Sequence, residues 1–90
     1  MKSLPDSREQ KLSESRLYWR CRRGMLELDY LLQNYLRKHY ESFTAADTAA
    51  FQKLLDTPDA LLLEYLMQRT IPVDPVIRDV IQKIRTAVTH

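Results

Sequence analysis

The residues with the greatest capacity for chemistry gather around the single glycine of the chain. Gly24 follows Arg22 and Arg23, and the carboxylates Glu27 and Asp29 come soon after it. Arginine donates several hydrogen bonds in a fixed geometry and carboxylates accept them, so this pattern suits recognition of polar groups on another molecule. Glycine adopts backbone angles that other residues resist, and it lets a second surface approach the main chain closely. This segment is therefore the first candidate for a functional site.

Two interpretations of this segment are open. If the second helix starts near Gly24, Glu27 lies in its first turn, where the helix dipole favours a carboxylate. Arg23 and Glu27 are four positions apart, so in a continuous helix they would share a face or an ion pair beside the bare backbone. The alternative is an ordinary helix corner, in which Gly24 ends the first helix. The residue types alone favour the ordinary corner. Trp19 is equally ambiguous, as a residue at the edge of the core or as an anchor for binding.

Catalytic and metal-binding chemistry finds little support. Cys21 is the only cysteine, which excludes an intrachain disulfide and a zinc site built on paired cysteines. Neither His39 nor His90 lies near it in sequence, so we interpret Cys21 as a half-buried structural residue despite the neighbouring arginines. One glycine cannot form a phosphate-binding loop. We expect no catalytic residue, no metal site and no enzymatic activity.

Charge is distributed unevenly along the chain. Residues 1–23 hold seven Lys/Arg and three Asp/Glu, whereas residues 24–90 hold seven and nine. The positive end suits an acidic protein surface. DNA binding by a helix-turn-helix is an alternative, but the arginines fall on the first helix rather than on a recognition helix. Glu27 and Asp29 would also repel phosphates. A protein-interaction module is the better interpretation.

Helices must position these residues. The length favours a single domain, 1–90, with residues 1–7 as a frayed N-terminus. Breakers separate five segments with helical spacing of apolar residues, at 7–22, 25–39, 45–55, 58–68 and 75–87. No segment shows the sustained alternation of a strand with hairpin turn signals. The sequence thus predicts an all-α fold, a compact five-helix bundle.

Local signals fix several helix ends and the core. Thr44 is the predicted N-cap of the third helix, with Asp47 completing a capping box. Thr57 is predicted to cap the fourth helix with Pro58 in its first position, and Asp74 repeats this signal before the next proline. The first helix is expected to present a mixed apolar and basic face, formed by Leu12, Arg16, Trp19 and Arg23. The expected core is Met25, Leu28, Leu31, Leu32, Tyr35, Leu36, Ala46, Ala50, Phe51, Leu54, Leu55, Leu61, Leu62, Tyr65, Leu66, Val76, Ile77, Val80, Ile81, Ile84 and Val88.

Targeting to a membrane is not expected. The longest apolar run, residues 60–63, is far shorter than the roughly 20 residues that span a bilayer. The first ten residues lack the apolar centre of a secretory signal. We therefore expect a cytoplasmic protein without direct membrane insertion.

The eleven residues from Trp19 to Asp29 resemble the signature of the SdhE (YgfY-type) family, the succinate dehydrogenase assembly factor 2 proteins. The core of that signature is the pattern Arg-Gly-x-x-Glu. The resemblance extends over about residues 13–86, through Phe51, Leu54, Leu55, Pro58, Asp59, Leu62, Tyr65, Leu66 and Met67. It implies a five-helix bundle that is not an enzyme. It also implies a chaperone-like factor that binds the flavoprotein subunit of succinate dehydrogenase, or of fumarate reductase in some bacteria, and promotes covalent attachment of FAD.

The resemblance also implies a contact surface. Arg23, Gly24 and Glu27 match the motif and are expected to bind the partner. The neighbouring residues assigned to the same surface are Trp19, Arg22, Met25 and Asp29. FAD is expected to belong to the partner, with no cofactor held stably by this chain, and the free chain is expected to be a monomer.

The match is imperfect at two positions. Tyr65 stands where many relatives have tryptophan, and Thr70 where many have a turn glycine. Relatives in some bacteria are also described as the antitoxin partner of a small inner-membrane protein. That role and nucleic-acid binding therefore remain as alternatives.

Overall fold

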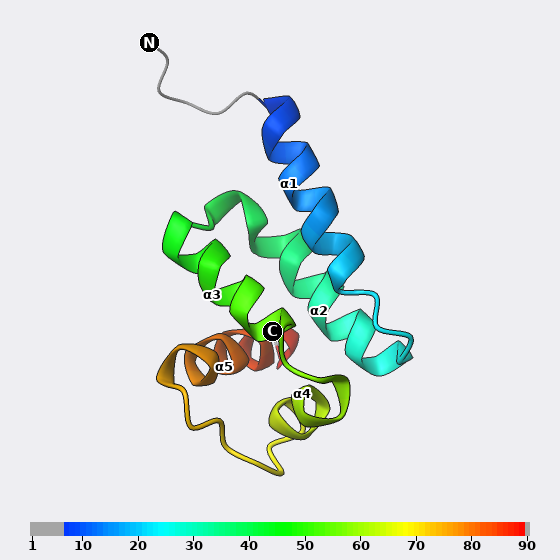
Figure 1. The fold of residues 1–90 in the computed structure, drawn as a ribbon, viewed down its shortest axis with the longest axis vertical. Helices are drawn as coiled ribbons and strands as arrows, with labels where there is room; N and C mark the ends of the chain where they lie inside the picture. Colours follow the sequence, from blue (N-terminus) through cyan, green and yellow to red (C-terminus); the bar gives the residue numbers. More distant parts are fainter. Residues whose placement is uncertain (1–6, 90) are drawn as a thin grey trace.

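The computed structural model describes the backbone of residues 7–89 and the side chains of residues 14–87. In that range the chain forms α1 (Ser7–Arg20), α2 (Leu26–His39), the 3-10 turn η1 (Tyr40–Ser42), α3 (Ala45–Leu55), α4 (Asp59–Leu66) and α5 (Pro75–Thr89). Residues 7–89 include no β-strand, which confirms the predicted all-α, five-helix fold. Figure 1 shows α1 extending away from the other helices, with its C-terminal part beside α2.

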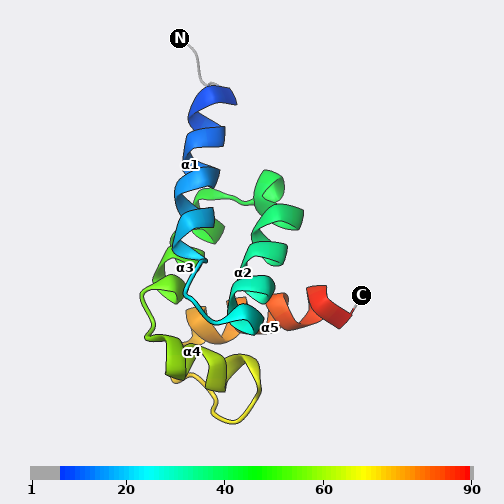
Figure 2. The same ribbon diagram turned by 90° about the vertical axis from the view of Figure 1, so that its right-hand side faces the viewer.

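The helices pack around α2 and α5. α5 packs against α2, α3 and α4, and α1 packs against α2. Figure 2 shows α5 lying across the direction of α2, at the end of the bundle away from the start of α1. This arrangement encloses an apolar core between helices that are distant in the sequence.

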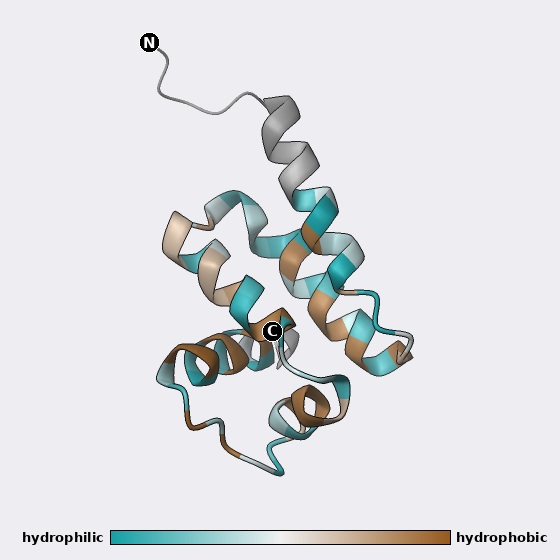
Figure 3. Ribbon diagram, in the orientation of Figure 1, coloured by the Kyte–Doolittle hydropathy of each residue, from teal (hydrophilic) through white to brown (hydrophobic). Residues whose placement is uncertain are grey.

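The buried core largely follows the predicted helical stripes. Leu28, Leu32 and Leu36 of α2 are completely buried, because residues three or four apart face the same side of a helix. Figure 3 shows apolar and hydrophilic residues alternating along these helices, as a buried face and an exposed face require. The other buried apolar residues are Leu17, Cys21, Tyr35, Phe51, Leu54, Leu55, Leu62, Leu66, Val80, Ile81 and Ile84.

Three residues expected in the core are exposed instead. Ala46 is exposed near the start of α3, and Leu61 and Val76 are 38% and 42% exposed near the starts of α4 and α5. Helical spacing identifies the apolar face of a helix but does not show how much of that face the neighbouring helices bury. The first turns of α3, α4 and α5 are not fully buried by their neighbours. Leu12 and Val88 lie outside the residues whose side chains are described.

The predicted caps of α3 and α5 are confirmed. The Thr44 hydroxyl accepts a hydrogen bond from the Asp47 N–H at 3.1 Å, and the Asp47 carboxylate accepts one from the Thr44 N–H at 3.0 Å. These reciprocal bonds form the capping box. They hold the pKa of Asp47 below its ordinary value, chiefly through the bond from the Thr44 N–H. At α5, Asp74 accepts from the Val76 N–H at 2.9 Å.

The predicted start of α4 is wrong by one residue. Pro58, not Thr57, is the N-cap, and the helix begins at Asp59. The Thr57 N–H is bonded to the carbonyl of Leu54 at 3.0 Å, so Thr57 still belongs to the turn that ends α3. The chain becomes extended only at Pro58, where ψ is 147°.

The predicted end of α4 at residue 68 is also wrong, because the helix ends at Leu66. Gln68 adopts a left-handed conformation with φ of 61°. Its N–H bonds to the carbonyl of Tyr65 at 3.1 Å, and the Arg69 N–H bonds to that of Glu64 at 2.9 Å. This pair of bonds is a Schellman motif, which closes a helix with a left-handed residue.

Candidate functional site at the glycine corner

The connection between α1 and α2, residues 20–29, forms what we call the glycine corner. α1 was predicted to reach residue 22 but ends at Arg20, and α2 begins at Leu26. Gly24 therefore lies in a loop between two separate helices and does not directly end the first one. Its φ is +85°, and a Cβ atom added there would meet no other atom within 4 Å. The backbone conformation, and not a lack of space within the chain, therefore favours glycine at this position.

Arg23 is the most highly connected residue of the glycine corner. Its Nε donates to the Asp59 carboxylate at 2.6 Å. Its Nη1 donates to the carbonyl of Leu55 at 2.8 Å, and its Nη2 to that of Thr57 at 2.7 Å. The side chain is only 13% exposed. The guanidinium is thus directed into the connection between α3 and α4.

The backbone of Arg23 is held as well. Its N–H donates to the Asp29 carboxylate at 2.6 Å, which ties the loop to the first turns of α2. Asp29 is accordingly half-buried. Both charged groups are used inside the protein, although the sequence suggested them as partner contacts.

The predicted pairing of Arg23 with Glu27 depended on a continuous helix, and the helix is interrupted. Arg23 pairs with Asp59, 36 positions away in the sequence, and Glu27 is exposed in the first turn of α2. No signal within the eleven-residue segment indicates Asp59 as the partner, because tertiary packing alone brings α4 to the corner.

Large apolar side chains close to Gly24 in the sequence are exposed. Trp19 is 61% exposed, Leu26 89% and Tyr30 62%. Most of the Trp19 side chain is therefore accessible to another molecule. The Arg22 guanidinium lies 5.1 Å from the centre of the Trp19 ring, within range of a cation–π interaction.

Leu26 and Tyr30 were missed by the sequence reasoning. They are four positions apart, so they share a face of α2 with Glu27. That face lies away from the buried stripe of Leu28 and Leu32. Two large apolar residues at helical spacing outside the core stripe are the signal that could have identified them. Met25, by contrast, is half-buried and packs against the core.

Cys21 is more deeply buried than expected. Its side chain is fully covered, and burial raises the pKa of its thiol to about 12 even though Arg23 and Arg20 act in the opposite direction. A thiol with this pKa stays protonated near neutral pH and is a poor nucleophile. Cys21 therefore contributes to packing rather than to chemistry.

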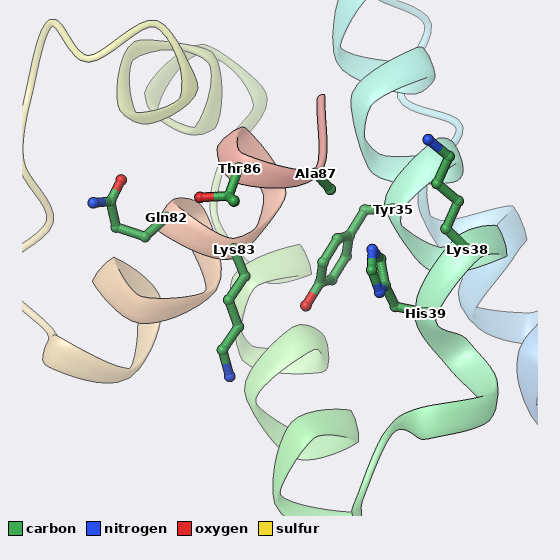
Figure 4. A pocket seen from close by; sticks show the side chains of 7 residues that line it. All are labelled: Tyr35, Lys38, His39, Gln82, Lys83, Thr86 and Ala87. Atoms are coloured by element: carbon green, nitrogen blue, oxygen red, sulfur yellow. The ribbon is translucent and has the colours of Figure 1, made fainter. Parts of the chain in front are cut away.

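A separate pocket lies at the other end of α2, between that helix and α5. Its volume is about 520 Å³, and Figure 4 shows the Tyr35 and His39 rings on one side of it, with the Lys83 chain on the other. Lys83 is 3.1 Å from Asp79, which raises the pKa of the ammonium group. The complete lining is Tyr35, Lys38, His39, Gln82, Lys83, Thr86 and Ala87.

Neither metal-binding clusters nor membrane-spanning helices occur in the part of the chain that the structure describes. Within it, no three residues of the types His, Cys, Asp and Glu gather in a way that could hold a metal ion. Within the same part, no helix combines the length and the apolar character needed to cross a bilayer.

Comparison with known proteins adds independent information. Residues 15–88, which include the whole glycine corner, match a family model described as flavinator of succinate dehydrogenase. The chain is 38% identical to the FAD assembly factor SdhE of Coxiella burnetii over 74 residues, or 82% of this chain and 90% of that protein. It is 44% identical to the FAD assembly factor SdhE of Pseudomonas aeruginosa over 69 residues, or 77% of this chain and 82% of that protein.

Proposed function

Because this chain belongs to the flavinator of succinate dehydrogenase family, we propose that it is an FAD assembly factor. It binds the flavoprotein subunit of succinate dehydrogenase and promotes the covalent attachment of FAD to that subunit. The flavoprotein of fumarate reductase is a second partner of the same kind. In this proposal the free chain is a cytoplasmic monomer.

The observation that carries the proposal is the outer surface of the glycine corner. Trp19, Leu26 and Tyr30 are each more than 60% exposed, and Gly24 and Glu27, which lie between them in the sequence, are exposed as well. Tryptophan, tyrosine and arginine are enriched among the residues that dominate binding energy at interfaces. Apolar side chains bordered by charges are typical of a protein-binding surface.

The factor acts by binding and not by catalysis. The Cys21 thiol is buried and stays protonated near neutral pH. Binding energy from the glycine corner favours one conformation of the flavoprotein, in which flavin attachment proceeds. Gly24 lets the factor's main chain approach the partner, and Glu27 and Arg22 orient polar groups on it. FAD belongs to the partner throughout.

The test is covalent flavinylation of the flavoprotein subunit, expressed together with variants of this chain. We expect Gly24→Arg and Glu27→Ala to abolish flavin fluorescence on the denatured flavoprotein band while the helical circular dichroism spectrum is kept. Glu41→Ala is the matched control, since Glu41 is also an exposed glutamate but lies in η1, beyond the C-terminal end of α2. Unchanged flavin fluorescence with both corner variants would contradict the proposal.

A pulldown separates this function from its alternatives. Recovery of a large FAD-containing subunit supports the assembly factor. Recovery of a small membrane protein supports an antitoxin-like role, and salt-sensitive retention of DNA supports nucleic-acid binding. The glycine corner exposes both Glu27 and Arg22, and this mixture of charges suits a protein better than a phosphate backbone.

A further inference from the structure

We propose that Arg23 is a positioning residue, which locks the glycine corner in the one geometry that the partner recognises. Its effect on binding rests on the proposed function, whereas its effect on the corner is a property of the free chain. The residue matches the family pattern at a position where the sequence suggests direct contact. The structure directs its side chain elsewhere.

Most N–H groups of the Arg23 guanidinium already donate hydrogen bonds within the protein. Asp59, the Leu55 carbonyl and the Thr57 carbonyl accept short hydrogen bonds from it, and the Arg20 carbonyl accepts a longer one at 3.3 Å. The side chain is 13% exposed. Direct contact through the guanidinium would require these bonds to break.

The acceptors lie at the ends of helices, where such bonds matter most. Leu55 is the last residue of α3 and Arg20 the last of α1, so their carbonyls have no acceptor role within their own helices. The C-terminal ends of helices carry partial negative charge, which favours a cation. Arg23 thus joins the ends of two helices to the first residue of α4.

The hydrogen bonds of Arg23, which we call the lock, lie next to the single glycine of the chain. Glycine restricts the backbone least, so Gly24 cannot by itself fix how α2 leaves the corner. Arg23 precedes it, with the backbone N–H held by Asp29 and the side chain held by Asp59. Together these bonds set the orientation of Glu27 and its neighbours relative to α1.

Two neighbouring aspartates provide a matched test. Asp59 binds Arg23, while Asp56 binds Arg20 at the same distance of 2.6 Å. The Arg20–Asp56 pair is exposed on both sides, at 42% and 73%. An exposed pair of this kind adds little to structure. Asp59→Ala therefore removes the only charged acceptor of the Arg23 side chain and leaves its carbonyl acceptors. Asp56→Ala removes a comparable ion pair in which Arg23 takes no part.

The experiment measures amide hydrogen exchange of residues 22–30 in the free variants, and binding of each to the succinate dehydrogenase flavoprotein. Both are measured where urea titration shows every variant fully folded. We expect Asp59→Ala and Arg23→Lys to exchange at least tenfold faster in the corner and to bind at least tenfold more weakly. Lysine keeps the charge but cannot reach all four acceptors. We expect Asp56→Ala to match the wild type in both measurements.

The outcomes distinguish the lock from the proposed function. Weak binding with unchanged exchange would show that Arg23 contacts the partner directly and would overturn the inference. Faster exchange with unchanged binding would overturn it as well. A wild-type chain that does not bind the flavoprotein would refute the proposed function, while the exchange data would still decide whether Arg23 holds the corner. If Asp59→Ala does not fold, Asp59→Asn removes the charge and keeps the shape, with a smaller change expected in the same directions.

Discussion

At the scale of single residues, the glycine corner combines two kinds of charged group. Arg23 and Asp29 are bound inside the protein, whereas Glu27 and Arg22 are exposed. Residues of one short motif can therefore have different roles. A buried, hydrogen-bonded side chain holds the fold, whereas an exposed one is available to a partner. Gly24 stands between the two kinds, with a backbone conformation that other residues adopt only at a cost.

Glycine at position 24 could be needed for its left-handed backbone or for the close approach of a partner to the main chain. Substitutions by the two enantiomers of alanine separate these two requirements. We expect Gly24→Ala to lower the free energy of unfolding by about 1 kcal/mol, because L-residues resist a left-handed backbone. A D-alanine at this position, introduced by chemical synthesis with ligation at Cys21, adopts positive φ without that cost. It should keep the wild-type stability in urea titration, because a D-residue meets no steric resistance in the left-handed region.

The D-alanine variant also tests the role of Gly24 in binding. If the partner approaches the bare backbone, the added methyl group should weaken flavoprotein binding although the fold is stable. Equal loss of stability for both alanine enantiomers would contradict the conformational explanation.

At the scale of helices, the ends are fixed by local hydrogen bonds of several kinds. α3 starts with a reciprocal capping box, and α5 starts with Asp74 bonded to the Val76 N–H. α4 ends in a Schellman motif whose left-handed position is occupied by Gln68 and not by a glycine. The end of α4 is thus the least favourable of these local structures.

Gln68→Gly should therefore stabilise the protein. Glycine adopts φ near 61° without the steric cost that a Cβ atom imposes, so we expect a gain of about 0.5–1 kcal/mol in the free energy of unfolding. Urea titration measures it. Thr70→Gly is the matched control, because Thr70 lies in the same connection without a positive φ and should show no gain. A gain at Thr70 equal to that at Gln68 would point to a general effect on the connection.

At the scale of the whole molecule, the bundle separates a stable core from the surface proposed to bind. α5 closes the core against α2, α3 and α4, and Ile84 is fully buried there. The glycine corner lies at the opposite end of α2 from the pocket that α5 helps to form (Figures 1 and 4). The core thus supports the corner without forming part of its surface.

Ile84→Ala should reduce stability without reducing binding. Loss of a buried isoleucine side chain costs about 2–5 kcal/mol, as measured by urea titration, whereas Gln82→Ala on the exposed side of α5 should cost far less. In the cold, while the variant remains folded, flavoprotein binding should stay within about twofold of wild type, because distant sites act nearly independently. A parallel loss of binding in the folded variant would show that α5 is coupled to the corner.

The five helices and much of the buried core could be predicted from the amino-acid sequence. Helical spacing gave the buried stripe of Leu28, Leu32 and Leu36, and the residue types of Thr44 and Asp47 gave a helix start that is correct to the residue. Both depend on interactions within a few positions of the chain. The charges around Gly24 indicated the glycine corner as a candidate site, because they too lie within a few positions of one another in the sequence.

Tertiary structure alone decided which residues of the corner face inward. Arg23 reaches Asp59, 36 positions away in the sequence, only because the fold brings the start of α4 to the glycine corner. The exposure of Leu26 and Tyr30, and of Leu61 and Val76 in the expected core, likewise depends on where neighbouring helices stop. Patterns within a short segment do not show where a helix distant in the sequence will pack. The division of the motif into the buried Arg23 side chain and an exposed surface can therefore be seen only in the assembled fold.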